Sequence, residues 1–485
     1  MKTITIDPIT RLEGHGKINI FLNEQGDVEN AYLQIPELRG FEKFSEGRRA
    51  EDMPQITSRI CGVCPVAHHI AAAKALDAAF HVEPPATAKK LRELLYCGYI
   101  IYDHILHFYF LGGPDFIVGP EAPAAKRNIL GVIEKAGLDI AKDVIKHRAY
   151  GQKITAILGG KATHPVSGLP GGVSKGLVQE EVKEIKDMVT SCNRFAKFSL
   201  DLFDDIVLKN KEYVELIRSD SYTLKTYNMG LVDKNNKVNF YDGMIRVTDQ
   251  EASEVEKFEV QDYTNHIAER VEEWSYMKFP YLKAVGWHGL TDGKKSGIYR
   301  VGPLGRLNAA EGMATPQADK EYKRMYDTLG GKPVNSTLAF HWARLIEILY
   351  ITERAKELIE DPDITSTHIR NPVGTPSAGC GVVEAARGTL IHDYKLDKNG
   401  LVQKANLIVA TTNNAGAITM SVRDAAKGVI KKGNVNEGLL NKIEMAFRAY
   451  DPCFGCATHS LPGGMPLTVN IYDHKKSLTR TISRT

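Results

Sequence analysis

Hydrophobic residues recur at intervals of three and four along four long stretches of the chain, which predicts amphipathic helices. The stretches are residues 65–80, 85–110, 176–209 and 336–360. The second stretch carries one apolar stripe, formed by Leu91, Leu94, Leu95, Ile101, Ile105 and Phe108. A stripe of this kind is typical of a helix packed in a protein core, so the pattern predicts a core of long helices.

Alternating apolar and polar residues predict short strands near both ends of the chain. KINIFLNEQGDVENAYLQI, residues 17–35, alternates on both sides of the turn-forming QGD, which indicates a β-hairpin. LIHDYKL and LVQKANLIV flank DKNG, residues 397–400, in the same way. Residues 221–315 are rich in glycine, tyrosine and short β-like runs and are predicted to form an insertion of mixed strand and loop. The predicted fold class is α/β, with helices and strands segregated as in α+β proteins: a long-helix bundle forms the core and small sheets lie at the periphery.

Composition fits a soluble globular protein. The chain has 485 residues, is 43% hydrophobic and 25% charged, and balances 62 basic against 59 acidic residues, so neither nucleic-acid binding nor membrane association is implied. The start, MKTITIDPITRLEG, has no targeting signal, and no apolar run reaches 18 residues. We therefore predict a cytoplasmic protein without membrane insertion. No linker interrupts residues 1–459, which predicts a single integrated domain.

Four of the seven cysteines form two CxxC pairs near opposite ends of the chain. Cys61 and Cys64 lie in RICGVCPVAHH, and Cys453 and Cys456 lie in DPCFGCATH. In a cytoplasmic protein these are expected to be thiols or metal ligands. One pair alone leaves half of a zinc site, a redox dithiol or another metal site open. Because a histidine follows each pair, the four thiolates are candidates for one shared site for nickel, iron, copper(I) or zinc.

Further compact polar motifs accompany the two pairs: RLEGHG at 11–16, RGFE at 39–42 and VEAARG at 383–388. With them, the chain resembles the large, catalytic subunit of NiFe hydrogenases. RICGVCPVAH corresponds to that family's RxCGxCxxxH, and DPCFGCATH corresponds to its DPCxxCxxH. The similarity extends from about residue 6 to 459 and implies the NiFe-hydrogenase large-subunit fold.

The resemblance implies a bimetallic centre. Cys61 and Cys453 would be terminal ligands of nickel, and Cys64 and Cys456 would bridge nickel to an iron that carries one CO and two cyanide ligands. Glu42 and His459 would bind magnesium, helped by a carbonyl of TTNNAG, residues 411–416. Hard oxygen ligands suit magnesium, and an imidazole ligand is less usual.

The resemblance also implies roles around the centre. Glu13 would accept a proton from the Cys453 thiol, and His68 would hydrogen-bond a bridging thiolate. His164, in GGKATHPVSGLPGG, would lie against the nearest iron–sulfur cluster of a partner. The same segment could be mistaken for a phosphate-binding loop, but it lacks the GKS or GKT ending of such loops.

Arg387 matches the family's arginine above the open metal positions, and Asp103 matches its acidic partner. Ala386 stands where the family commonly has proline, so the local backbone is expected to differ. The remaining histidines near the motifs are expected to pack or to line an interface: His69, His104 and His107. The spare cysteines are expected to be buried small side chains: Cys97, Cys192 and Cys380.

The implied activity is reversible heterolytic cleavage of H2 to protons and electrons. An iron–sulfur cluster typically needs four thiolates, and this chain has three to spare, so the clusters must lie in a partner subunit. We therefore predict an obligate heterodimer with an iron–sulfur small subunit.

The subtype most similar is the cytosolic methyl-viologen-reducing class, which does not use the deazaflavin coenzyme. TSRICGVCPVAHH, YRVGPLGRLNAAEGM and the ATH after Cys456 carry that resemblance. It implies an electron-transfer subunit, a heterodisulfide reductase complex and a place in methanogenesis. The alternatives are the core of an NAD- or deazaflavin-reducing hydrogenase, a metal-free scaffold of the respiratory complex I type, and a structural zinc protein.

Twenty-six residues follow DPCFGCATH. In the family a dedicated protease cuts after the motif's histidine once nickel is bound, so residues 460–485 would be a maturation peptide. LTVNIYD within them is predicted to form a strand, and a retained structural role is the alternative.

Overall fold

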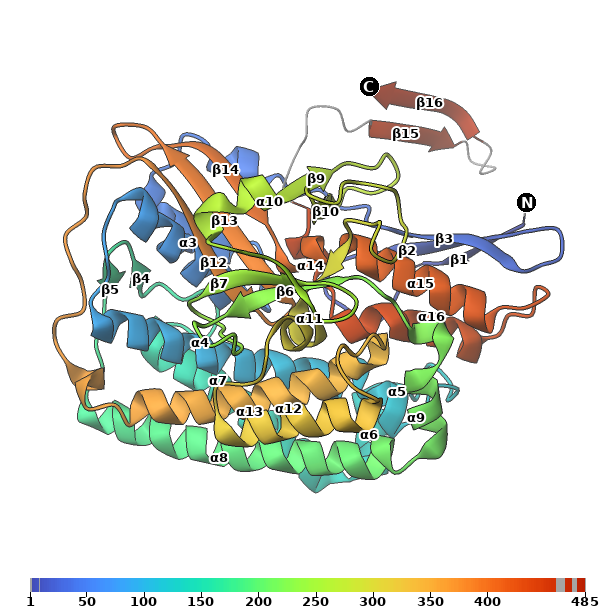
Figure 1. The fold of residues 1–485 in the computed structure, drawn as a ribbon, viewed down its shortest axis with the longest axis horizontal. Coiled ribbons are helices and arrows are strands. Elements are labelled where there is room, and N and C mark those ends of the chain that lie inside the picture. The colour runs from blue at the N-terminus through green and yellow to red at the C-terminus, as the bar shows by residue number, and fades with distance from the viewer. Residues whose placement is uncertain (1, 8, 459–466, 473–477, 485) are drawn as a thin grey trace.

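The computed structural model describes residues 2–7, 9–458, 467–472 and 478–484, and a layer of long helices forms one side of the molecule (Figure 1). The layer comprises α4 (Ala86–Leu106), α7 (Leu138–Gly159), α8 (Gln179–Phe203), α12 (Pro316–Leu329) and α13 (Phe340–Ile359). Helix α4 packs against α7 and α13, and α8 packs against the same two helices. Most side chains of α13 are buried, so this helix lies at the centre of the layer.

All four predicted helices are confirmed, with shifted ends. Helix α4 continues into a π-helical turn, η2 (His107–Gly112), and α8 continues into a second one, η3 (Asp204–Leu208). Helices α7 and α12 were not predicted. The buried positions of α7 include Gly151, His147 and Thr155, so this helix has no continuous apolar stripe.

The remaining helices of the described residues lie outside this layer. They are α1 (Phe41–Ser45), α2 (Met53–Ser58), α3 (Pro65–Ala79), α5 (Pro114–Ile117), α6 (Ile129–Ala136), α9 (Lys211–Arg218), α10 (Tyr263–His266), α11 (Gly302–Ala309), α14 (Ala410–Asn413), α15 (Ala415–Val429) and α16 (Glu437–Tyr450). In the described part of the chain, no helix combines the length and hydrophobicity that a membrane crossing requires.

Both predicted hairpins are present, and each gains a third antiparallel strand. The first sheet is β1 (Lys2–Ile6), β2 (Lys17–Leu22) and β3 (Val28–Gln34); the second is β12 (Ala378–Ala385), β13 (Gly388–Leu396) and β14 (Val402–Ile408). β15 (Leu467–Tyr472) pairs with β16 (Leu478–Arg484), so the strand predicted in the C-terminal extension is confirmed. The two-stranded ribbon of β4 (Gly168–Leu169) and β5 (Gly172–Val173) follows α7.

The segment 221–315 contains a four-stranded sheet in the order β11-β6-β7-β8 and a separate β9–β10 pair. The strands are β6 (Tyr227–Val232), β7 (Met244–Thr248), β8 (Glu254–Phe258), β9 (Ile267–Arg270), β10 (Phe279–Leu282) and β11 (Tyr299–Arg300). The prediction of mixed strand and loop is confirmed for most of it. It is wrong for α11, an eight-residue helix whose residues are all buried.

Close packing between α3 and β12 positions the site. A Cβ on Gly379 would lie 2.2 Å from Ala79 N, and one on Gly381 would lie 2.3 Å from Ala75 N. Glycine in the strand and alanine in the helix therefore bring the two backbones together. This contact fixes the start of α3, which carries Cys64, relative to the β12–β13 hairpin, which carries Arg387 at its tip.

Candidate metal centre

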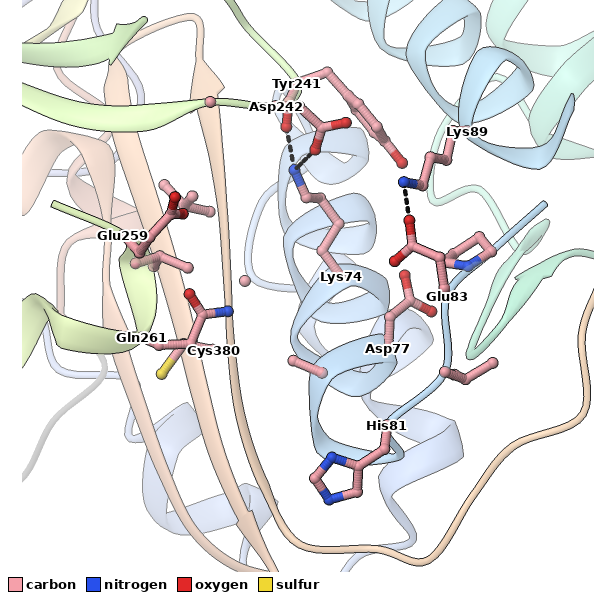
Figure 2. Close-up of a pocket in the computed structure, with 17 residues that line it drawn as sticks. Lys74, Asp77, His81, Glu83, Lys89, Tyr241, Asp242, Glu259, Gln261 and Cys380 are labelled. Carbon is pink, nitrogen blue, oxygen red and sulfur yellow. Dashed lines mark hydrogen bonds and ion pairs between the residues drawn. The ribbon is translucent and has the colours of Figure 1, made fainter. Parts of the chain in front are cut away.

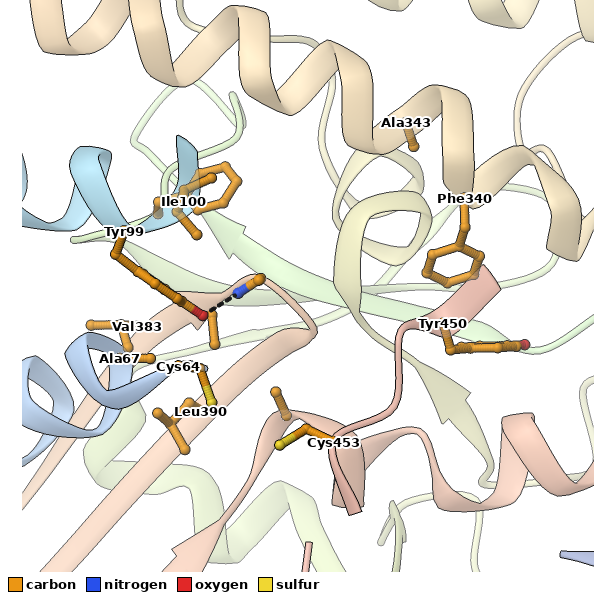
Figure 3. Close-up of a cluster of buried hydrophobic side chains, with 14 of the residues drawn as sticks. Cys64, Ala67, Tyr99, Ile100, Phe340, Ala343, Val383, Leu390, Tyr450 and Cys453 are labelled. Carbon is orange, nitrogen blue, oxygen red and sulfur yellow. Dashed lines mark hydrogen bonds between the residues drawn. The ribbon is translucent and has the colours of Figure 1, made fainter. Parts of the chain in front are cut away.

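The four cysteines of the two CxxC pairs meet in one buried cluster. Their sulfurs all lie within 4.8 Å of one another, and each cysteine is at most 5% exposed. The Sγ atoms of Cys61 and Cys453 are 3.5 Å apart, and those of Cys64 and Cys456 are 3.4 Å apart. Figure 3 shows the sulfurs of Cys64 and Cys453 directed into the same buried space.

This donor set fits a metal centre and not a disulfide pair. The Sγ–Sγ separations of 3.5 Å and 3.4 Å across the pairs, and of 2.8 Å between Cys453 and Cys456, exceed the roughly 2.05 Å of a disulfide bond, and all four cysteines are free. A metal–sulfur bond of about 2.3 Å with tetrahedral angles places thiolates about 3.8 Å apart, close to the two cross-pair distances. Hydrogen bonding from Cys453 holds the pKa of Cys61 well below its usual range, whereas burial raises the pKa of Cys453 and Cys456.

Local structure explains how two distant segments reach the same point. Cys61 and Cys64 lie between α2 and α3, and Cys453 and Cys456 follow α16 directly. Asp451 ends α16 in the left-handed conformation, with φ 57° and ψ 54°, and turns the chain inward before Pro452. The backbone N–H groups of Val63 and Cys64 both point to Cys61 Sγ, at 3.2 and 3.3 Å, which favours an anionic sulfur there.

Glu13 reaches the second pair through a backbone bridge to Cys453. The Cys453 thiol lies 2.9 Å from Glu13 Oε2, and the Gly455 N–H donates to the same oxygen at 3.0 Å. Burial raises the pKa of Glu13, and negative charge on Cys61 raises it further. The carboxyl group is therefore placed to exchange a proton with the sulfur.

Arg387 occupies the tip of the β12–β13 hairpin, and its guanidinium is held by two carboxylates. Nη1 and Nη2 each donate to Asp103 at 3.1 Å, and Nη2 lies 3.0 Å from Asp451 Oδ2. All three side chains are buried, and burial raises the pKa of Asp451 to about 7. Asp103 is the partner expected from the sequence. Asp451 was missed, although its place in the DPC motif was a signal for it.

A second buried ion network, not predicted from the sequence, supports this tip. Arg306 on α11 donates two hydrogen bonds to Glu347, at 2.7 and 2.8 Å, and one to Glu384, at 2.6 Å. It also donates to the Ala385 carbonyl at 2.8 Å, just before the turn. His104 Nε2 lies 2.8 Å from Glu347, so this histidine belongs to the network.

Ala386 uses the N–H that a proline would lack. Tyr99 OH accepts its hydrogen bond at 3.0 Å, as the dashed line in Figure 3 shows. Tyr99 is fully buried on α4. The hairpin tip is thus anchored to the helix layer by a contact that depends on alanine, or another residue with an N–H, at this position.

The histidines near the cysteines have buried partners. His68 Nδ1 lies 3.1 Å from His392 Nε2, and burial lowers the pKa of His68 to about 4. His69 Nδ1 lies 2.9 Å from the Pro54 carbonyl, and His69 Nε2 accepts from Gly168 N at 2.8 Å. His107 Nε2 lies 2.7 Å from the Arg448 carbonyl. His69 and His107 are therefore packing residues, as expected.

Three further expected features lie at the periphery of the site: His164, Glu42 and the segment 411–416. His164, half-buried, donates from Nδ1 to the Ser58 carbonyl at 2.9 Å, beside the loop that carries Cys61. Glu42 Oε1 accepts from Leu407 N at 2.8 Å, at the end of β14. Within 411–416, Thr411 Oγ1 accepts from Cys453 N at 3.0 Å. His459 lies outside the described residues, so the expected magnesium site is described only in part.

A separate polar cleft lies beside the C-terminal half of α3, which contributes Lys74, Asp77 and Ala78 to its lining (Figure 2). Its lining includes Cys380, which is half-buried and not buried as predicted, because β12 exposes that side chain to the cleft. Cys97 and Cys192 are buried as expected. Lys74 in this cleft pairs with Asp242 at 2.7 Å, and none of the expected site residues that the structure describes lines the cleft.

Known proteins and a family profile match nearly the whole chain. A sequence profile described as nickel-dependent hydrogenase matches residues 39–129 and 143–459, and a HoxL-like profile matches residues 3–38. An F420-non-reducing hydrogenase iron-sulfur subunit of Archaeoglobus profundus is 46% identical over 99% of this chain and 99% of its own length. An F420-non-reducing hydrogenase subunit of Methanothermobacter marburgensis is 40% identical over 99% of this chain and 100% of its own. The NAD-reducing hydrogenase HoxS subunit beta of Cupriavidus necator is 39% identical over 97% of each chain.

Solved structures show the same fold. An NAD+-reducing NiFe-hydrogenase in the H2-reduced state superposes with a TM-score of 0.89 at 37% identity, covering 95% of this chain and 100% of its own. The Ni-Fe-Se hydrogenase of D. vulgaris Hildenborough superposes with a TM-score of 0.76 at 24% identity, covering 94% and 100%. The large-subunit fold implied by the sequence motifs is therefore confirmed.

Proposed function

This chain belongs to the nickel-dependent hydrogenase family and is the large, catalytic subunit of a NiFe hydrogenase, and on that premise we propose how its residues divide the work of cleaving H2 reversibly into protons and electrons. The observation that carries the proposal is the four-cysteine cluster, with a carboxyl group 2.9 Å from one sulfur and a buried arginine beside it. A purely structural metal site has no need of either group.

Cys61 and Cys453 would hold nickel alone, and Cys64 and Cys456 would hold nickel and iron together, with CO and two cyanides on the iron. When bound, the bimetallic centre supplies the Lewis acidity and the redox capacity for the reaction. Thiolates are soft ligands that suit both metals. Binding of the metals also replaces the protons that Cys453 and Cys456, whose pKa values are raised by burial, otherwise keep.

Proton transfer is the task of Glu13. Its position 2.9 Å from Cys453 Sγ is within hydrogen-bond reach, and its raised pKa brings it nearer to the range in which a carboxyl group can both accept and release a proton. The carboxyl group would take the proton from the Cys453 sulfur and pass it outward.

Arg387 is a fixed cation beside the sulfurs. The two bonds to Asp103 hold its guanidinium against that carboxylate, and the contact with Asp451 holds the same group through a second carboxylate. Because arginine does not lose its proton, it would orient and polarise H2 without competing for the proton that Glu13 receives.

Three further assignments follow the family pattern. His68 would hydrogen-bond a bridging thiolate while His392 fixes its ring. Glu42, the segment 411–416 and His459 would hold magnesium. His164, beside the Cys61 loop, would face the nearest cluster of an iron–sulfur small subunit, through which the electrons leave.

We base the proposed subtype on the sequence identities to the relatives. Identity reaches 46% with the F420-non-reducing relative and 39% with the NAD-reducing one, which supports a cytoplasmic methyl-viologen-reducing enzyme that feeds a heterodisulfide reductase complex in methanogenesis. Residues 460–485 would be removed by a maturation protease after nickel binding. Assay of the purified complex with methyl viologen, F420 and NAD+ discriminates the three classes.

Metal analysis with infrared spectroscopy tests the centre itself. The purified complex is expected to contain nickel and iron and to show absorption bands of iron-bound CO and cyanide. Cys456→Ser should abolish these bands, whereas Cys380→Ser, in the separate cleft, should retain them. Zinc in place of nickel and iron, with no such bands in the unmodified protein, would refute the assignment.

A further inference from the structure

A cleft of about 600 Å³ reaches Glu13 from the protein surface. Besides Glu13, its polar side chains are His15, Glu37 and Arg39; Gly14, Leu38 and Gly455 complete the lining. Glu13 is partly buried, and the side chain of His15 is 73% exposed, so the cleft passes from a buried carboxyl group to solvent. A proton released by Glu13 can therefore enter this cleft.

The chemistry of the lining limits which groups can carry that proton. A guanidinium group does not act as a proton carrier in proteins, and Arg39 Nη1 already donates to the carbonyls of Ile60 and Gly455. Glycine and leucine carry no titratable side chain. This leaves His15 and Glu37 as the lining groups, apart from Glu13 itself, that can accept and release protons.

His15 and Glu37 form a pair that suits this task. His15 Nδ1 contacts Glu37 Oε1 directly. When the carboxylate accepts the Nδ1–H, the other ring nitrogen, Nε2, is left as the basic atom. The carboxylate also stabilises the imidazolium that forms when Nε2 takes up a proton. Imidazole is the side chain best suited to exchange protons with water near neutral pH.

The backbone fixes the distance from this pair to the metal centre. Gly14 has φ 86°, and a Cβ on it would lie 2.7 Å from Gly455 N. Glycine therefore lets the segment of residues 13–15 lie directly on the loop that carries Cys453 and Cys456. Glu13 meets the sulfur, and His15, two residues later, lines the outer part of the same cleft.

We propose that His15, held by Glu37, is the proton-transfer residue that connects Glu13 to solvent. The proposal rests on the function proposed above for Glu13. In the direction of H2 oxidation, the O–H bond of the Glu13 carboxyl group breaks and an N–H bond forms at His15 Nε2, through water in the cleft. The imidazolium then gives its proton to buffer. No electron moves in either step, and the reverse sequence supplies protons for H2 formation.

Chemical rescue tests the proposal in the complete hydrogenase complex. His15→Gln removes the titratable group and keeps a polar side chain of similar size. In dilute buffer, kcat for H2 oxidation should fall at least about ten-fold. The ratio kcat/KM for H2 should be unchanged, because the proton leaves after H2 has been cleaved. Added free imidazole should restore kcat with saturation. Glu37→Gln should give a smaller loss with the same rescue.

Two controls separate proton transfer from structure. His368→Gln changes an exposed histidine outside this cleft and should behave as the unmodified enzyme. Glu13→Gln should lose activity that imidazole does not restore, because Glu13 itself lies between the cleft and the Cys453 sulfur. Infrared difference spectra add a readout besides turnover: in His15→Gln, the bands of iron-bound CO and cyanide should be unchanged, and the carboxyl band of Glu13 should recover more slowly after a potential step.

Either of two results would overturn the proposal: unchanged kcat of His15→Gln at every buffer concentration, or a loss that imidazole does not restore in an enzyme with normal infrared bands. An unmodified complex without nickel, iron or hydrogenase activity would instead refute the proposed function. The two failures are therefore distinguishable.

Discussion

Gly455→Ala adds one methyl group where the structure leaves no room for it. The new Cβ would lie 2.7 Å from Glu13 Oε1 and 3.1 Å from Oε2. Ordinary contact begins at 3.4 Å, so the carboxyl group must retreat by at least about 0.7 Å. If the whole carboxyl group retreats by that much, the 2.9 Å contact with Cys453 Sγ lengthens to about 3.6 Å. The 3.0 Å bond from Gly455 N lengthens to about 3.7 Å, which is too long for a good hydrogen bond.

The expected result is an intact but slow enzyme. A misplacement approaching 1 Å in a reacting group costs on the order of 100-fold in rate. The free energy of unfolding should fall by only about 1 kcal/mol, the net value of one hydrogen bond. Isotope exchange between H2 and D2O measures the rate, and infrared bands of iron-bound CO and cyanide report whether the centre is intact.

The first CxxC pair offers a matched control. Gly62 lies inside the Cys61–Cys64 loop as Gly455 lies inside the Cys453–Cys456 loop, and a Cβ on Gly62 would meet no atom within 4 Å. Gly62→Ala should therefore exchange isotopes at the normal rate. Equal losses in both variants, or normal exchange in Gly455→Ala, would contradict the reasoning.

Three further outcomes are expected. Arg306→Met should lower the free energy of unfolding by about 3–5 kcal/mol, because it leaves two buried carboxylates without their cation. Arg354→Met, at a partly exposed ion pair, should lower it by less than about 1 kcal/mol. Similar urea midpoints for the two variants would contradict this. Tyr99→Phe should cost about 1–3 kcal/mol by leaving the Ala386 N–H unpaired, and adding Ala386→Pro should recover part of that cost, since proline has no N–H. Burial lowers the pKa of His69 to about 4 from the ordinary 6.5. The stability that neutral His69 contributes is therefore complete above pH 6.5 and falls by about 3 kcal/mol as the pH drops toward 4. The free energy of unfolding of His69→Gln, measured in urea, should depend less steeply on pH in this range, and an unchanged slope would refute this assignment.

Sequence periodicity predicted the helices that bury large apolar side chains in regular stripes. It missed α7 because His147, Gly151 and Thr155 are buried among the apolar residues Val144, Ile154 and Leu158 and interrupt the hydrophobic period. It also missed α11, where glycine and proline at the start are typical of a loop but here form the first turn of a buried helix.

For the candidate site too, the sequence predicted one set of residues and missed another. Motifs identified the four cysteines, Glu13 and Arg387, since each lies in a short pattern of fixed spacing. The supports around Arg387 were not predicted: Arg306 is 81 positions away along the chain, and Glu347 is 40 away. Such contacts depend on how α11, α13 and the β12–β13 hairpin pack together. No local pattern records that packing.

The separation of the two halves of the metal centre also has a consequence for biosynthesis. Cys61 and Cys453 lie 392 positions apart. At a synthesis rate of about 5–20 residues per second, the first pair leaves the ribosome roughly 20–80 s before the second pair exists. During that interval Cys61 and Cys64 are two reduced thiols without partners, open to oxidation and to capture of zinc. The complete four-sulfur site therefore exists only after Cys456 has been synthesised, so a metal centre that needs all four ligands is completed only when translation is nearly finished.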